Sequence, residues 1–146
     1  MRRVVVDSSL AVKWFLPEPG AQEARQLALT WEDVEVWAPD LIWVEAANAA
    51  RHKVLAGELS ADEAGMALGE FLAANLQVLS CRRTGLDTLS VALHTGLIAW
   101  DAAYVSAARA LGAELWTADR EMQSRGRRAY PNIHLLTWPS AHEGEA

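Results

Sequence analysis

The sequence predicts an α/β protein, a three-layer α/β/α sandwich around a central, mainly parallel five-stranded sheet. Two observations support this fold class. Short segments rich in β-branched residues alternate with longer segments whose apolar residues recur at helical spacing, and this alternation is typical of parallel strand pairing. The opening run, residues 3–6, is apolar at successive positions, so we expect a strand that is buried on both faces.

The expected elements follow one another along the whole chain. In order, they are a strand at 3–6, helices at 10–16 and 21–31, a strand at 35–38, helices at 41–55 and 60–75, a strand at 78–81, helices at 84–95 and 101–111, a strand at 114–117, a helix at 120–125 and a strand at 133–137.

Turn and capping residues define the expected boundaries. Pro17 and the Pro19-Gly20 pair stop the first helix. Ser60 and Glu63 have the spacing of a capping box, in which a serine side chain and a glutamate side chain each bind a free backbone N–H group. Glycines follow three of the expected helices, those at 41–55, 84–95 and 101–111, where a left-handed residue commonly ends a helix: Gly57, Gly96 and Gly112.

The composition of the 146 residues is that of one globular domain. Hydrophobic residues make up 51% and charged residues 22%, which excludes a disordered chain. No apolar run approaches the roughly 20 residues of a membrane-spanning helix. Cys81 is the one cysteine and can form no internal disulfide. We therefore expect a single domain over 1–138, a frayed tail over 139–146, no membrane association and a cytoplasmic location.

The net charge of −6 argues against a general nucleic-acid coat protein, which would be basic. It does not exclude an enzyme that acts on nucleic acid, because clustered acids that bind a divalent cation also make the count more negative.

Three acids stand beside strand or helix ends. Asp7 and Asp119 come just after expected strands, where open α/β sheets bind their ligands, and Asp101 begins an expected helix. Each has an ordinary alternative role, because aspartate is a preferred N-cap residue. Together they are expected to gather at the carboxyl edge of one sheet.

Glu45 is the fourth acid, inside the helix expected at 41–55. Val44, Ala46 and Ala47 flank it, and no cation lies four residues away. Asn48 follows at i+3, so a polar stripe runs along an otherwise apolar helix. The alternative is a glutamate that faces solvent on an amphipathic helix. The functional interpretation is slightly favoured, because a buried acid needs a partner.

Clustered carboxylates are the ligands that Mg²⁺ prefers, together with water and substrate phosphates. Ions of this kind activate water and stabilise the leaving oxygen of a phosphodiester. The histidines show no metal-binding or catalytic spacing, and no glycine-rich phosphate loop is present.

The chain resembles a PIN domain, most closely the VapC toxins of bacterial and archaeal toxin–antitoxin pairs, from Arg3 to about Trp138. Four segments carry the likeness in order: the strand with Asp7, the helix with Glu45 and Asn48, Trp100-Asp101-Ala102-Ala103-Tyr104, and Thr117-Ala118-Asp119.

The resemblance implies a metal-dependent ribonuclease that hydrolyses RNA with a Mg²⁺ or Mn²⁺ site. Asp7 and Asp101 would be the most direct metal ligands, with Glu45 and Asp119 binding directly or through water. Ser9 and Thr117 would supply hydroxyls at the edge of the site, and Asn48 would orient its neighbours. The family also implies a homodimer and a cognate antitoxin whose C-terminal segment wraps the toxin.

Four arginines and several tryptophans have two possible roles each. Arg120, Arg125, Arg127 and Arg128 follow Asp119 and could hold RNA phosphates, although a solvated helix face explains them at least as well. Most of the seven tryptophans are expected in the core or a dimer interface, and one or two exposed rings could stack on RNA bases or receive antitoxin side chains.

Two enzyme classes are disfavoured by residues of the chain. A haloacid-dehalogenase phosphatase would need an acid where Ser9 stands, and a receiver domain would need a late lysine, whereas the last lysine is Lys53. The remaining alternative is a catalytically weak or inactive PIN-like module that binds RNA or protein.

Overall fold

The computed structural model describes residues 1–139, and most of the tail expected to be frayed, residues 140–146, lies outside the described part. Five strands form one sheet in the order β3-β2-β1-β4-β5, with every neighbouring pair parallel. The strands are β1 (Arg2–Val6), β2 (Val34–Pro39), β3 (Gln77–Leu79), β4 (Glu114–Thr117) and β5 (Ile133–Leu135).

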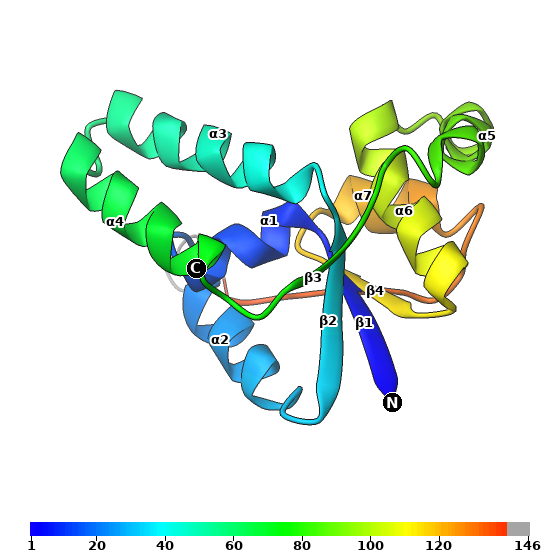
Figure 1. The fold of residues 1–146 in the computed structure, drawn as a ribbon, viewed down its shortest axis with the longest axis horizontal. Helices are drawn as coiled ribbons and strands as arrows, with labels where there is room; N and C mark the ends of the chain where they lie inside the picture. The colour runs from blue at the N-terminus through cyan, green and yellow to red at the C-terminus, as the bar shows by residue number, and fades with distance from the viewer. Residues whose placement is uncertain (140–146) are drawn as a thin grey trace.

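Helices cover both faces of the sheet, which confirms the predicted α/β/α sandwich. Figure 1 shows α1 to α4 on one side of β1 and β2, and α5 to α7 on the other. The helices are α1 (Ser8–Ala11), continued by the 3-10 turn η1 (Val12–Trp14), α2 (Ala21–Leu29), α3 (Ile42–Leu55), α4 (Ala61–Leu72), α5 (Gly85–Thr95), α6 (Ala99–Leu111) and α7 (Arg120–Gly126).

Two helix starts differ by two residues from the sequence-based expectation, and the others agree within one residue. The helix expected from residue 10 begins directly after β1, because the Asp7 backbone carbonyl accepts hydrogen bonds from the N–H groups of Leu10 (3.1 Å) and Ala11 (3.0 Å). The helix expected from residue 101 begins at Ala99, with Ile98 in extended conformation at its N-cap. Asp101 therefore lies inside the first turn of α6 instead of capping it.

The predicted capping box is present at the start of α4. The Ser60 hydroxyl accepts from the Glu63 N–H (3.1 Å), and the Glu63 carboxylate accepts from the Ser60 N–H (2.9 Å).

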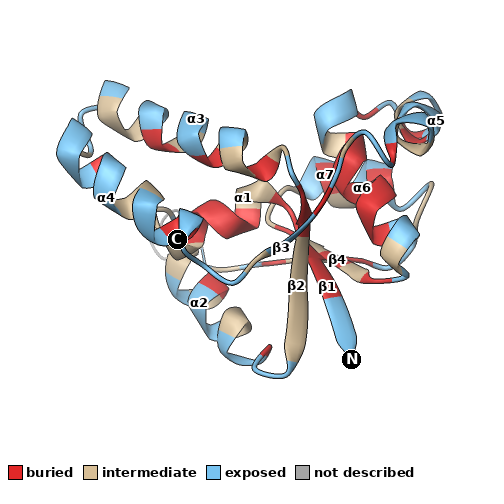
Figure 2. Ribbon diagram, viewed as in Figure 1, coloured by how far each residue is buried: buried red, intermediate tan, exposed pale blue. Residues whose placement is uncertain are grey.

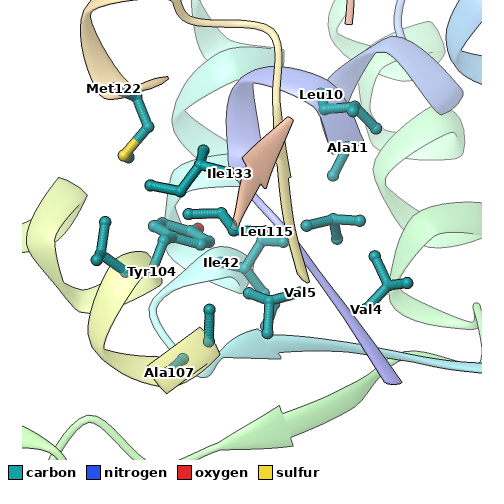
Figure 3. Close-up of a cluster of buried hydrophobic side chains, with 14 of the residues drawn as sticks. Val4, Val5, Leu10, Ala11, Ile42, Tyr104, Ala107, Leu115, Met122 and Ile133 are labelled. Carbon is teal, nitrogen blue, oxygen red and sulfur yellow. The ribbon is translucent and has the colours of Figure 1, made fainter. Parts of the chain in front are cut away.

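The core forms where the central strand meets α6. Val4, Val5 and Val6 are fully buried, as expected for a parallel strand covered on both faces, and Figure 2 shows this burial in β1 and along α6. In Figure 3, Val5, Leu115 and Tyr104 belong to the same apolar cluster. Burial at about 25 cal/mol per Å² of apolar surface makes this cluster the main stabilising element of the fold.

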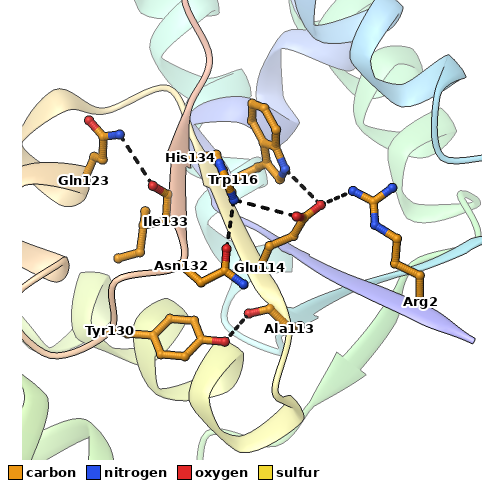
Figure 4. Close-up of polar contacts among 9 residues, drawn as sticks. All are labelled: Arg2, Ala113, Glu114, Trp116, Gln123, Tyr130, Asn132, Ile133 and His134. Atoms are coloured by element: carbon orange, nitrogen blue, oxygen red, sulfur yellow. Dashed lines mark hydrogen bonds and ion pairs between the residues drawn. The ribbon is translucent and has the colours of Figure 1, made fainter.

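Polar contacts close the opposite edge of the sheet, at the amino ends of the strands (Figure 4). Glu114 pairs with Arg2 and accepts from the Trp116 indole N–H (3.3 Å), which links β1 to β4. The Tyr130 hydroxyl donates to the Ala113 carbonyl (2.6 Å).

The chain connects the strands so that β1 lies between β2, which follows it, and β4, which comes much later. The connections therefore run in opposite directions from β1, and such a switch point opens a crevice at the carboxyl ends of the strands. Within residues 1–139, no helix is long and apolar enough to cross a membrane.

Two glycines provide a matched test of the packing. A Cβ atom at Gly126, at the end of α7, would lie 2.7 Å from Ile133 Cδ1 and 3.3 Å from Val105 Cγ2, whereas a Cβ atom at Gly65 in α4 would meet nothing within 4 Å. We expect Gly126→Ala to lower the free energy of unfolding by about 1 kcal/mol, because the overpacking outweighs the gain in helix propensity. Gly65→Ala should raise it by about 0.5 to 1 kcal/mol through higher helix propensity.

Urea denaturation of the two variants measures both effects. Equal stability of Gly126→Ala and the wild type would contradict the tight contact between α7, α6 and β5.

Candidate active site

A cleft of about 680 Å³ opens beyond the carboxyl ends of β1 and β4. α3 and the start of α6 form its walls, and the four predicted acids all line it: Asp7, Glu45, Asp101 and Asp119. The other lining residues are Ser8, Ser9, Val12, Leu41, Val44, Asn48, Ala49, His52 and Trp100. The structure thus brings residues from four distant parts of the chain into one space.

Asp7 ends β1 and lies at the N-cap position of α1, but its side chain makes no capping hydrogen bond. Asp7 is 4% exposed, and its Oδ2 atom accepts from the hydroxyls of Thr117 (2.6 Å) and Ser9 (2.8 Å). Burial raises the pKa of Asp7, the two hydroxyl hydrogen bonds oppose this effect, and the nearby charge of Asp119 adds to it.

The hydroxyls of Ser9 and Thr117 join the ends of β1 and β4. They lie 3.2 Å apart, and each also accepts a backbone N–H: Ala118 donates to Ser9 Oγ and Asp119 to Thr117 Oγ1, both at 3.0 Å. Because each hydroxyl contacts both the Asp7 carboxylate and the turn before α7, the two side chains fix Asp7 and Asp119 relative to one another. This arrangement supports the edge position predicted for both residues.

Glu45 projects from α3 toward α6 and does not face solvent. Its Oε1 atom accepts a hydrogen bond from the hydroxyl of Tyr104 at 2.6 Å, and the carboxylate is half-buried. Burial is the main cause that raises the pKa of Glu45 to about 7. The Tyr104 hydrogen bond acts against the rise, and the charges of Asp7 and Asp101 add to it.

Asp101 lies in the first turn of α6, with its side chain in the cleft. Its pKa is raised to about 6, chiefly by burial and then by the charges of Asp7 and Asp119. Its alternative role as an N-cap is wrong, because Ile98 occupies that position.

Asp119 is the N-cap of α7, its ordinary alternative role, and it also lines the cleft. Its Oδ1 atom accepts from the N–H groups of Glu121 (2.8 Å) and Met122 (3.4 Å), so it caps α7. One carboxylate oxygen is used by the cap, and Asp119 nevertheless lines the cleft beside the other acids.

The acids suit a hard divalent cation by their chemistry, since carboxylate and hydroxyl oxygens are the ligands that Mg²⁺ and Mn²⁺ prefer. As they are oriented, however, no three His, Cys, Asp or Glu side chains within residues 1–139 lie close enough to hold one ion. Hydrogen bonds direct Asp7 toward Ser9 and Thr117, and Glu45 toward Tyr104. The donor set therefore fits a metal ion, and binding requires side-chain rotation within the cleft.

Asn48 lies at the cleft as expected, and the four arginines after Asp119 are exposed, which is compatible with the solvated helix face given as their alternative. Asn48 lines the cleft one turn from Glu45, and its amide lies 3.4 Å from His52 Nε2. Within the described part of the chain, the cleft lining includes none of the four arginines after Asp119. Arg125 instead pairs with Glu121 (3.0 Å) and donates to the Gly96 carbonyl (3.2 Å).

Tyr104 is a site residue to which sequence reasoning assigned no role. It is fully buried, and it holds Glu45 through the 2.6 Å hydrogen bond. The signal available in the sequence was its position three residues after Asp101, which places the two side chains on neighbouring parts of one helix face.

The model of the PIN-domain family matches residues 4–127, which is most of the chain. The protein belongs to the PIN-domain family. The predicted resemblance is thereby confirmed. A curated relative, Ribonuclease VapC3 of Pyrobaculum aerophilum, is 31% identical over 126 residues, which cover 84% of this PIN-domain chain and 94% of the relative.

Solved structures share the fold of this PIN-domain protein. A crystal structure of a Pyrobaculum aerophilum protein is 25% identical, has a TM-score of 0.64 and covers 85% of this chain and 79% of its own. A toxin–antitoxin complex from Klebsiella pneumoniae is 14% identical and has a TM-score of 0.60, and the match covers 93% of this chain and 99% of the chain in that structure. VapBC2 from Rickettsia felis, bound to a DNA fragment of its promoter, is 16% identical and has a TM-score of 0.61, and the match covers 94% of this chain and 99% of the chain in that structure.

The raised carboxyl pKa values predict an unusual pH dependence of stability for the metal-free PIN domain. Because Glu45 and Asp101 have higher pKa values in the folded state than their ordinary values of 4.5 and 3.8, the folded state binds more protons than the unfolded state between about pH 4 and 7. Their contribution to stability is full below this window and is lost as the pH rises through it. We expect the midpoint of urea unfolding to fall from pH 5 to pH 7, and Glu45→Gln to flatten that fall.

Glu70→Gln, at an exposed position on α4, is the matched control and should keep the wild-type pH dependence. A midpoint that rises over the same pH range in the wild type would contradict the raised pKa values.

Proposed function

We propose that this PIN-domain protein is a divalent-metal-dependent ribonuclease and the toxin of a toxin–antitoxin pair. The observation that carries the proposal is the gathering of Asp7, Glu45, Asp101 and Asp119 in one cleft. Family membership and the 31% identity to a ribonuclease support the enzymatic prediction.

Asp7 and Asp101 are the proposed direct ligands of Mg²⁺ or Mn²⁺, with Glu45 and Asp119 binding directly or through water. When bound, such an ion supplies the Lewis-acid chemistry that activates water and stabilises the leaving oxygen of a phosphodiester. The raised pKa values of Glu45 and Asp101 support this assignment, because a cation removes the repulsion among the carboxylates that contributes to them.

The other residues of the cleft hold these acids in place. Ser9 and Thr117 each donate to Asp7, and Tyr104 donates to Glu45, so both carboxylates are held beside the cleft in the metal-free protein, and they exchange some of these contacts when an ion binds. Trp100, 54% exposed at the rim, provides an aromatic face on which an RNA base can stack. Asn48 and His52 line the opposite wall on α3 and can donate hydrogen bonds to phosphate oxygens.

The proposal includes a cognate antitoxin and a homodimer. Exposed apolar residues available to such partners follow one face of α5 at helical spacing: Leu86, Leu89 and Leu93 are 89%, 56% and 79% exposed. The structural neighbours from Klebsiella pneumoniae and Rickettsia felis are toxin–antitoxin proteins, which supports a protein partner here. The arginine contacts with RNA and the cytoplasmic location stay predictions.

The alternative, a PIN-like module with weak or no activity, is separated from the enzyme by two conservative variants. We expect Asp7→Asn and Asp101→Asn to reduce Mn²⁺-dependent cleavage of single-stranded RNA by at least roughly a hundredfold, because each removes a charge from the acidic cleft. The fold should persist, and Asp7→Asn should be as stable as the wild type or more so, since it removes a buried charge whose pKa burial raises.

Asp40→Asn is the matched control for the cleavage assay. Asp40 follows the neighbouring strand β2 at the same edge of the sheet, but it accepts a hydrogen bond from the Cys81 N–H (3.1 Å) and lies outside the cleft lining. This variant should cleave RNA at the wild-type rate. Equal cleavage by the wild type, Asp7→Asn and Asp101→Asn would show that the acidic cleft is not the catalytic site.

A further inference from the structure

A second pocket, of about 310 Å³, lies between the start of α5 and the C-terminal half of α6 and shares no lining residue with the acidic cleft. It is lined by Arg83, Thr84, Asp87, Ser106, Arg109 and Ala110. Two arginines and one acid give it a local excess of positive charge, although the whole chain has a net charge of −6. This charge favours an anion as the occupant.

Thr84 is a buried polar residue that lacks a hydrogen-bond partner for its side chain. It is 7% exposed and stands at the N-cap of α5, yet its hydroxyl makes no capping hydrogen bond. Within residues 1–139, Thr88 Oγ1 is the one fully enclosed side-chain polar atom without a partner, so the Thr84 hydroxyl opens to the pocket that it lines. This hydroxyl has no hydrogen-bond partner in the part of the chain that the structure describes and is not fully enclosed, so it is available to a ligand.

The backbone beside Thr84 offers further donors. α5 has 11 residues, and the N–H groups of its first turn have no partner within the helix and carry the positive end of its dipole. A Cβ atom at Gly85 would meet nothing within 4 Å, so no side chain packs over this residue. Helix N-termini of this kind bind phosphate and similar anions.

Asp87 does not cancel the positive charge of the pocket. Its carboxylate accepts a hydrogen bond from the Ser106 hydroxyl (2.7 Å) and pairs with Arg109 (3.4 Å between Oδ1 and Nη2). Arg83 has no ion-pair partner among the described residues. The charge of Asp87 is therefore balanced by Arg109, and the charge of Arg83 remains for a ligand.

We propose that this pocket is a phosphate-binding site. The Thr84 hydroxyl and the guanidinium of Arg83 hold the phosphate oxygens, the N–H groups of the first turn of α5 lie beside them, and Arg109 stays paired with Asp87. The phosphate belongs either to the backbone of an RNA strand or to a small free phosphate compound. The site is independent of the acidic cleft and of the proposed nuclease activity.

Amide NMR of the full chain in metal-free buffer, titrated with inorganic phosphate, tests the site. We expect saturable shifts of the Gly85 and Leu86 amides. Arg83→Ala and Thr84→Val should each weaken binding roughly tenfold, as expected for the loss of one hydrogen bond to a charged ligand. Arg82→Ala removes a neighbouring exposed arginine that lies outside the pocket lining, and this matched control should bind phosphate like the wild type.

A second titration with single-stranded RNA in the same buffer identifies the source of the phosphate. RNA binding that weakens in Arg83→Ala and Thr84→Val but not in Arg82→Ala supports an RNA backbone phosphate. If the affinity for RNA is unchanged in the variants whose affinity for inorganic phosphate falls, the natural ligand is a small free phosphate compound.

The absence of saturable shifts at Gly85 and Leu86 in the wild type would overturn the proposal, as would an equal loss of phosphate binding in Arg82→Ala and Arg83→Ala. If Thr84→Val does not fold, Arg83→Gln at its exposed position provides the second variant.

Discussion

The candidate site depends on the contact between Asp7 and the hydroxyls of Ser9 and Thr117. β1 carries Asp7 at its carboxyl end, and Thr117 is the last residue of β4, so the hydrogen bond of 2.6 Å joins two strands that lie side by side in the sheet but 110 positions apart in the sequence. A buried carboxylate without such donors would be destabilising. The same two hydroxyls accept the N–H groups of Ala118 and Asp119, so the fold and the position of two acids are fixed by one small network.

The remaining acids extend this network by charge instead of by hydrogen bonds. Asp7 raises the pKa of both Glu45 and Asp101, and Asp119 raises those of Asp7 and Asp101. Four carboxylates that repel one another in a partly buried cleft are an unfavourable arrangement unless protons or a cation neutralise them. Carboxylates with raised pKa values, gathered in a cleft at a sheet edge, are typical of a functional site.

Much of the fold could be predicted because its signals are local. The β-branched run of β1, the capping box of α4 and the glycines after α3, α5 and α6 each specify one element without knowledge of the others. The four acids could be assigned to one edge because the carboxyl ends of parallel strands and the helices that follow them meet there.

Other features depend on tertiary contacts that the sequence does not display. The partner of Glu45 is Tyr104, 59 positions away, and only the tertiary fold brings these two side chains of α3 and α6 together. The start of α6 at Ala99 was missed because an aspartate is the usual N-cap, whereas Ile98 takes this place and Asp101 enters the cleft. Arg125 donates to the Gly96 carbonyl, 29 positions away, which the sequence could not indicate, whereas its i,i+4 pair with Glu121 was readable from the helical spacing.

The central claim, that the four acids form one metal site, is tested most directly by calorimetric titration of Mn²⁺ into the wild type, Asp7→Asn and Asp40→Asn, extended into the millimolar range. The account predicts saturable binding to the wild type and to Asp40→Asn, and its loss in Asp7→Asn. Binding of Mn²⁺ to Asp7→Asn with the affinity of the wild type, or no binding to the wild type, would contradict it.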